Sequence, residues 1–212
     1  MDSIFDPGLV LGLPLWQLDG GTFMSRDAYG HVGIVAGATW QKEGRYFDGI
    51  DDDIDFGNPS VLNITDGLTI AAWFRPSGMD EHGYIVSKCN GNKSSGYSLY
   101  LSGSTDQIQV IGTNGDSANS DAVFVDDETW VHAAVIAKGG QINFYRNAES
   151  AGNASRTIAD PSASKLMVGN RDSGTTELVY FKGVIGEILI FGRALTPLEI
   201  QRIYQMTGWR YR

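Results

Sequence analysis

Apolar and polar residues alternate in many short runs along this chain, and such alternation is typical of β-strands that bury one face. In residues 68–74 (LTIAAWF), four apolar side chains share one face, Trp73 lies on the other, and Pro76 ends the run. Further runs occupy residues 96–103, 107–111, 129–136, 141–146 and 187–191. Turn residues separate the runs, with about a dozen residues from one strand to the next, which favours a sandwich over alternating β-α-β units.

Two local signals add to this pattern. Residues 138–140 (KGG) separate two runs, and because glycine adopts positive φ they predict a tight hairpin. Near the end of the chain, Thr196 fits a helix N-cap, Pro197 the first helical position, and Glu199 completes a capping box. The apolar residues that should share one face of this helix and pack on the sandwich are Ile200, Ile203 and Tyr204.

The composition indicates one globular domain over residues 1–212. Its 42% hydrophobic residues and 27 glycines suit a packed core with many turns, and the single Cys89 leaves no internal disulfide. The formal net charge of −9, without a basic stripe, argues against nucleic acid as a partner. No apolar run reaches the ~18 residues of a membrane-spanning helix. We therefore expect no membrane insertion, and residues 1–7 show no secretory signal.

Several blocks of the sequence resemble one family. Residues 45–54 (RYFDGIDDDI) are similar to its Phe-Asp-Gly-x-Asp-Asp-x-Ile/Val block, and residues 130–134 (WVHAA) to its Trp-x-His-Val-Ala strand. Residues 181–191 (FKGVIGEILIF), followed by RALT, resemble its closing strand. The family is the laminin-G-like group of the concanavalin A-like lectin and glucanase superfamily. The resemblance implies an all-β fold: an antiparallel two-sheet jelly-roll sandwich with one short C-terminal helix.

The sequence offers no recognisable catalytic motif, so we expect a protein that is not an enzyme. The Glu-x-Asp-x-x-Glu strand of glucanase relatives is absent, and Glu128, Glu177 and Glu187 show no carboxylate partner along the same strand face. No nucleophile elbow surrounds Cys89, and the three histidines lack metal-ligand spacing. A carboxylate pair assembled from distant strands remains the alternative.

An acidic run at residues 48–55 (DGIDDDID) is the one constellation suited to a metal, because hard carboxylate oxygens bind calcium. Asp48, Asp51 and Asp53 are the predicted ligands. If the run is extended, Asp51, Asp53 and Asp55 share one face, and either solvent or a cation must offset their repulsion. A solvated strand edge and a calcium site are both open. The resemblance implies a further calcium ligand from an Ile-Asp-Glu-Val block, but Gly186 replaces that aspartate here.

Polar and aromatic residues in glycine-containing segments are expected at the ends or rim of the sandwich, where they could stack on sugars or bond their hydroxyls. Each also fits the simpler description of a turn residue that satisfies its own backbone. Trp16, Trp40, Trp73 and Trp130 fall in strand-like blocks and are expected in the core. The predicted carbohydrate-binding residues are Tyr84, Asn92, Tyr97, Asn114, Asp116, Asn170 and Asp172.

These observations favour a binding module that recognises carbohydrate on a glycan or glycoprotein surface, with calcium as an assisting ion. The first alternative is a structural or display protein, such as a virion decoration or adhesion subunit, that forms homo-oligomers or assembles on a larger particle. The second is a glycoside hydrolase or lyase without a recognisable motif. An extracellular or virion-surface location fits the binding and display interpretations better than a cytoplasmic one.

Overall fold

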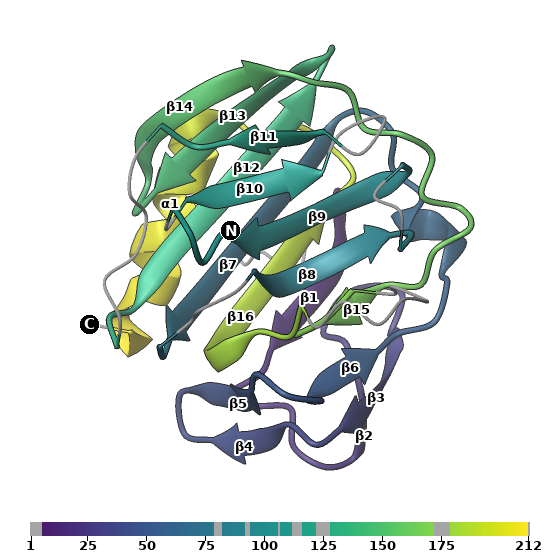
Figure 1. Ribbon diagram of the computed structural model, residues 1–212, viewed down its shortest axis with the longest axis vertical. Coiled ribbons are helices and arrows are strands. Elements are labelled where there is room, and N and C mark those ends of the chain that lie inside the picture. The colour runs from purple at the N-terminus through teal and green to yellow at the C-terminus, as the bar shows by residue number, and fades with distance from the viewer. Residues whose placement is uncertain are drawn as a thin grey trace.

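Two antiparallel β-sheets packed face to face make up the body of the protein (Figure 1). The computed structural model describes residues 6–78, 82–91, 94–105, 107–111, 116–121, 128–171 and 179–211. Within these residues each sheet contains eight strands, and one short α-helix follows the last strand. The predicted fold class, an antiparallel sandwich with a C-terminal helix, is confirmed.

The first sheet, here called sheet A, is built around the long strands near the middle and end of the chain. Strand β1 pairs with β16 outside the main order of the sheet. The main order is β14 (Glu149–Ser155), β13 (Gln141–Arg146), β12 (Val131–Lys138), β7 (Leu68–Pro76), β16 (Lys182–Phe191), β5 (Gly44–Asp48) and β4 (Thr39–Gln41), with β1 (Leu9–Pro14) alongside.

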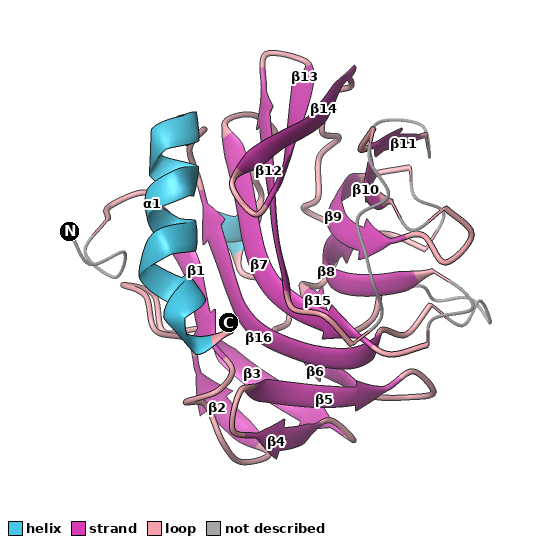
Figure 2. Ribbon diagram, turned by 90° about the vertical axis from the view of Figure 1, so that its left-hand side faces the viewer, coloured by secondary structure: helices cyan, strands magenta, loops and turns pink. Residues whose placement is uncertain are grey.

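The second sheet, sheet B, lies across the core from sheet A (Figure 2). A 3-10 helix, η2 (Ser60–Leu62), connects β6 of this sheet to β7 of sheet A. The strand order is β11 (Ser117–Asn119), β10 (Ile108–Ile111), β9 (Gly96–Leu101), β8 (Gly83–Cys89), β15 (Met167–Val168), β6 (Asp53–Asp55), β3 (Val32–Ala36) and β2 (Thr22–Met24).

Strand β7 shows how the alternation in the sequence produces the layers. Its alternate apolar side chains, from Leu68 to Phe74, enter the core between the sheets, as predicted. Trp73 points to the outer side of sheet A, and it is still 97% buried because the C-terminal segment covers it. Its indole Nε1 donates a hydrogen bond to Thr207 Oγ1 at 2.7 Å, and Tyr204 stacks on its ring. Sheet A is therefore buried on both faces in this region.

Helix α1 (Pro197–Thr207) lies on the outer face of sheet A (Figure 2), and a 3-10 helix, η4 (Gly208–Arg210), follows it. The predicted capping box is confirmed, because Thr196 Oγ1 accepts from the Glu199 amide and Glu199 accepts from the Thr196 amide. Ile200 is fully buried, and Ile203 packs against the same cluster. None of the described helices is long and apolar enough to cross a membrane.

The turn between β12 and β13 confirms the predicted hairpin, since Gly139 and Gly140 have φ values of 59° and 75°. The tryptophan prediction is only partly correct. Trp73 is buried, but Trp16 and Trp130 are half-buried and Trp40 is 45% exposed. Trp40 lies on β4, the edge strand of sheet A, where no neighbouring strand covers it.

Candidate functional site

Two of the predicted carbohydrate-binding residues are buried, where they cannot contact a sugar. Tyr84 lies in β8 and Tyr97 in β9, and both side chains are fully buried. The Tyr97 hydroxyl donates to the Leu62 carbonyl at 3.0 Å, and the Tyr84 ring stacks on Tyr100. Neither ring can present a face to a sugar, so the rim position predicted for them is wrong. The cause is that this part of sheet B is covered on both faces.

Of the other predicted sugar contacts, the structure describes Asn170 and Asp116, and these two have different partners. Asn170 is buried, donates from Nδ2 to Asp53 Oδ2 at 3.3 Å and accepts from the Arg171 amide. Asp116 is exposed and lies 3.8 Å from an Arg156 guanidinium nitrogen. Asn92, Asn114 and Asp172 lie outside the described residues.

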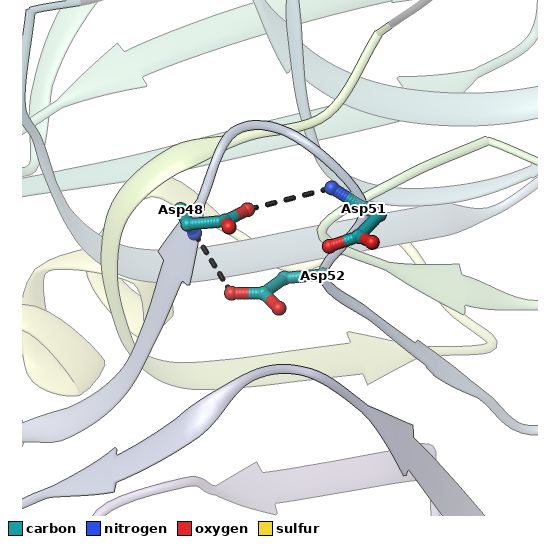
Figure 3. A group of neighbouring side chains, drawn as sticks. All are labelled: Asp48, Asp51 and Asp52. Atoms are coloured by element: carbon teal, nitrogen blue, oxygen red, sulfur yellow. Dashed lines mark hydrogen bonds between the residues drawn. The ribbon is translucent and has the colours of Figure 1, made fainter.

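The acidic run folds into a turn rather than a single extended strand. Gly49, with a φ of +81°, lets the chain reverse after β5, and only Asp53–Asp55 form strand β6. Oxygens of Asp48, Asp51 and Asp52 consequently lie within 4.8 Å of one another (Figure 3). Asp53 is not among them, and its carboxylate accepts a hydrogen bond from Asn170. The structure therefore brings together two of the three predicted metal ligands, Asp48 and Asp51, with Asp52 as the third acid of the cluster.

Hydrogen bonds within the turn use several of these oxygens. Asp48 Oδ1 accepts from the Ile50 amide at 2.7 Å, and Asp52 Oδ2 accepts from the Asp48 amide at 2.8 Å. Burial raises the pKa of the Asp52 carboxyl, the hydrogen bond from the Asp48 amide lowers it, and the two neighbouring aspartates raise it further. These contacts account for the turn without a cation. Calcium binding by this turn stays a prediction.

A more extended feature lies along the edge of β1. One hollow, of about 640 Å³, is lined by Gln17, Leu18, Asp19, Phe23, Met24, Ser25, Arg26, Asp27 and Gly30. A second, of about 600 Å³, is lined by Leu9, Gly12, Pro14, Trp16, Gln17, Arg26, Glu187 and Leu189. Gln17 and Arg26 line both, so the hollows adjoin, and together they are called the groove below.

Hydrogen bonds to two charged side chains, Arg45 and Asp27, fix the walls of the groove. The Arg45 guanidinium donates to three backbone carbonyls, those of Leu18, Gly20 and Ala38, and so holds the wall that carries Asp19. The Asp27 carboxylate accepts from the amides of Gly12, Tyr29 and Gly30 and ties the opposite wall to β1. Because these bonds are made before any ligand arrives, the shape of the groove is preorganised.

Glu187 forms part of the floor. It lies in β16 opposite Pro14 of β1 and projects from the outer face of sheet A beside Leu189. Its carboxyl is half-buried, and no hydrogen bond or ion pair from the described residues reaches it. Burial raises the pKa of Glu187 to about 7, although the positive charge of Arg210 acts in the opposite direction. A carboxyl with a strongly shifted pKa in a surface hollow is a feature of binding and catalytic sites.

The side chains of Gln17 and Arg26, which line both hollows, are also available to a ligand. Among the described residues, no side-chain hydrogen bond or ion pair engages Gln17 or Arg26, and both side chains are exposed. Beside them are the apolar surfaces of Trp16, Pro14 and Leu189. Among the described residues, the groove thus offers one cation, one amide and one carboxyl whose side chains make no hydrogen bond or ion pair, next to apolar surface.

Sequence patterns do not reveal this site. Glu187 lies in a predicted strand as an isolated acid, and Trp16 falls in a block expected in the core. One signal is present: Glu187 is the one charged residue of the predicted strand 187–191 (EILIF), at a position where period-2 alternation would place an apolar side chain on a buried face.

Comparison with solved structures establishes the fold. A mutant of Trypanosoma rangeli sialidase displaying trans-sialidase activity matches with a TM-score of 0.74 and 14% identity, over 97% of this chain and 34% of the sialidase. The receptor-binding domain of botulinum neurotoxin D gives a TM-score of 0.69 and 14% identity over 94% of this chain and 52% of that domain. This chain therefore spans about a third of the length of the sialidase and about half of the length of the neurotoxin domain.

A third structure has nearly the same length as this chain. It is domain 4 of AbnA, an extracellular arabinanase from Geobacillus stearothermophilus, in complex with arabinotriose, with a TM-score of 0.68 and 15% identity over 93% of this chain and 98% of that domain. A search of curated protein sequences finds no significant match. The sequence profile of the concanavalin A-like lectin/glucanases superfamily matches residues 47–201, and the chain belongs to this superfamily.

Proposed function

We propose that this chain is a non-catalytic carbohydrate-binding module and that the groove is its glycan site. The observation that carries the proposal is the convergence of Gln17, Arg26 and Glu187, whose polar groups have no partner among the described residues, on a surface hollow with an apolar floor. Sugars need both kinds of contact, because their hydroxyls take hydrogen bonds while their C–H faces pack on apolar and aromatic surface.

The charge of the site favours a neutral glycan. The groove contains Arg26 as its cation and three carboxyl groups, those of Asp19, Asp27 and Glu187, on a chain whose formal net charge is −9. An anionic sugar would meet an unfavourable potential on approach. A neutral oligosaccharide meets no such barrier and is the ligand class proposed.

Binding without catalysis is the better fit to the carboxyl groups. Hydrolysis of a glycosidic bond normally requires two carboxyl groups, one on each side of that bond. Among the described residues, Glu187 is the one acid that lines its own hollow, and Asp19 and Asp27 line the other one. Among the similar structures, domain 4 of the arabinanase was solved with a bound arabinotriose, which supports glycan binding by this chain.

A glycan array followed by calorimetric titration of the strongest neutral ligand tests the proposal. Arg26→Ala should weaken binding about tenfold, since a hydrogen bond from a charged group contributes about 1.5–3 kcal/mol. Arg202→Ala is the matched control, because Arg202 is an exposed arginine on helix α1 and does not line the groove. An array without any glycan signal, or an equal effect of both substitutions, would contradict the proposal.

The same ligand also tests the absence of catalysis. Prolonged incubation with the polysaccharide from which it derives should release no reducing ends. Release that disappears in Glu187→Gln would instead identify Glu187 as a catalytic acid and make the protein a hydrolase.

A further inference from the structure

A guanidinium lies between two tryptophan rings at one end of the groove. The central carbon of the Arg210 guanidinium is 3.4 Å from the centre of the Trp16 ring and 4.4 Å from the centre of the Trp209 ring. Such cation–π contacts stabilise the relative position of the three side chains. Trp16 is a lining residue of the groove, so Trp209 is separated from the groove by this one guanidinium.

Trp209 is held in place and yet exposed. Its side chain belongs to η4, directly after helix α1, and it is 69% exposed, the largest value among the described large apolar residues. Exposing an indole to water is unfavourable compared with burying it, since aromatic side chains are among those that gain most from burial. Contact with Arg210 restricts the ring without covering it. The result is an aromatic face that is preorganised and accessible.

A third tryptophan is attached to the segment that carries Trp16. Trp40, which is 45% exposed, donates from its indole Nε1 to the backbone carbonyl of Trp16 at 3.1 Å. This bond ties the segment that carries Trp16 to β4 at the edge of sheet A. Trp16 is thus linked to Trp40 through its backbone carbonyl and to Trp209 through the Arg210 guanidinium.

We propose that the exposed face of Trp209 is a sugar-stacking position that extends the groove, so that the protein binds longer neutral oligosaccharides through sugar units outside the two hollows. The inference rests on the proposed glycan-binding function. Its ligand class is a neutral saccharide whose ring presents an apolar C–H face, because that is the group an indole face accepts. Arg210 acts as a positioning residue, since it orients Trp209 and has one face on Trp16.

The test measures affinity as a function of oligosaccharide length. Wild-type protein and variants are titrated with a panel of neutral oligosaccharides from two to six units, arabinotriose included, and with the anionic trisaccharide sialyllactose as a comparison. Trp209→Ala should weaken binding of the longest ligands about five- to tenfold, because that is the loss of affinity expected when one aromatic contact is removed. Binding of the disaccharides should not change, because they fill only the hollows. Trp209→Phe should retain most of the affinity for long ligands.

Two controls separate stacking from folding. Leu198→Ala truncates a residue that is 55% exposed at the opposite end of helix α1, and it should leave every affinity unchanged. Melting temperatures of all variants show whether the fold is retained, and Trp209→Phe provides the test if Trp209→Ala unfolds.

Each outcome is informative. If wild-type protein binds long ligands and Trp209→Ala binds them equally well, or loses affinity for disaccharides to the same degree, the stacking position is wrong and the proposed function stands. If no member of the panel binds wild-type protein, the proposed function fails first, and this inference fails with it.

Discussion

The ring of Tyr211 lies against the backbone of Gly186, so closely that a Cβ atom at position 186 would come within 2.5 Å of the ring. The ring cannot easily move away, because it stacks on Trp73 and contacts Trp130, with ring centres 4.8 and 4.6 Å apart. Position 186 is where the family resemblance implies a calcium-binding aspartate. With Tyr211 in place, no side chain fits there, so this chain lacks that ligand for a steric reason.

We therefore expect Gly186→Ala to destabilise the protein by about 1–3 kcal/mol, the usual cost of overpacking a filled core. The measurement is the free energy of unfolding from denaturant titration. The same substitution in a Tyr211→Ala background should cost much less, because the obstructing ring is gone. Equal losses in the two backgrounds would show that Gly186 is needed for another reason, such as its backbone conformation.

The raised pKa of Glu187 predicts a specific dependence of stability on pH. Below about pH 4.5 the carboxyl is protonated in both the folded and unfolded states and costs nothing. As the pH rises from 4.5 to its folded-state pKa of about 7, the unfolded chain ionises first, so wild-type stability falls. Above pH 7 the full cost is reached, about 3 kcal/mol. Glu187→Gln should therefore match wild type at pH 4 and be more stable at pH 8.

The comparison of wild type with Glu187→Gln isolates this carboxyl. His132 is buried, and burial lowers its pKa to about 3, which gives a pH dependence of the opposite sign, but it is present in both proteins and cancels. The control is Glu149→Gln, at an exposed position in β14. Its stability relative to wild type should not diverge between pH 4 and pH 8 in this way. A constant difference between wild type and Glu187→Gln at all pH values would mean that the carboxyl titrates normally.

The prediction of calcium binding by Asp48, Asp51 and Asp52 is tested by chelation. Bound calcium stabilises the folded state by RT ln(1 + [Ca]/Kd), about 2.7 kcal/mol at a hundred times Kd, so EDTA should lower the melting temperature. Asp51→Asn is the appropriate variant, because the Asp51 carboxylate is exposed and makes no hydrogen bond within the described turn, whereas Asp52 holds the Asp48 amide. The variant should lose the EDTA-sensitive part of stability.

The alternative for this turn gives the opposite result. If the aspartates only repel one another in solvent, EDTA leaves the melting temperature unchanged and Asp51→Asn is more stable than wild type. Magnesium serves as the control cation, because it demands near-ideal octahedral geometry and loses its waters reluctantly, so a calcium site should prefer calcium.

The sequence was sufficient for features set by neighbouring residues and insufficient for features set by distant ones. The alternation in β7 and the cap at Thr196 act over a few residues, and both predictions were correct. The groove joins Gln17, Arg26 and Glu187, which no local pattern connects. The prediction for Tyr84 was wrong for a related reason. Alternation identifies the face of the sheet to which a side chain points, but not whether another part of the chain covers that face.

One buried hydroxyl predicts how firmly the C-terminal segment is attached to sheet A. Thr69 in β7 is fully buried, and its Oγ1 donates to the Arg193 carbonyl at 2.9 Å and accepts from the Leu195 amide at 3.0 Å. Thr69→Val keeps the shape of the side chain and leaves a buried donor and a buried acceptor unsatisfied, each at a cost of about 1–3 kcal/mol. Because two groups lose their partner, we expect the free energy of unfolding to fall by at least about 2 kcal/mol.

Thr69→Ser separates the hydroxyl from the methyl group. It retains both hydrogen bonds and removes one buried methyl, so its cost should stay near ~1 kcal/mol. Hydrogen exchange adds a local measurement, because in Thr69→Val the Leu195 amide should lose its protection while the amides of β12 keep theirs. If Thr69→Ser instead destabilises the protein more than Thr69→Val does, packing of the methyl group and not the pair of hydrogen bonds fastens the segment before helix α1 to the sheet.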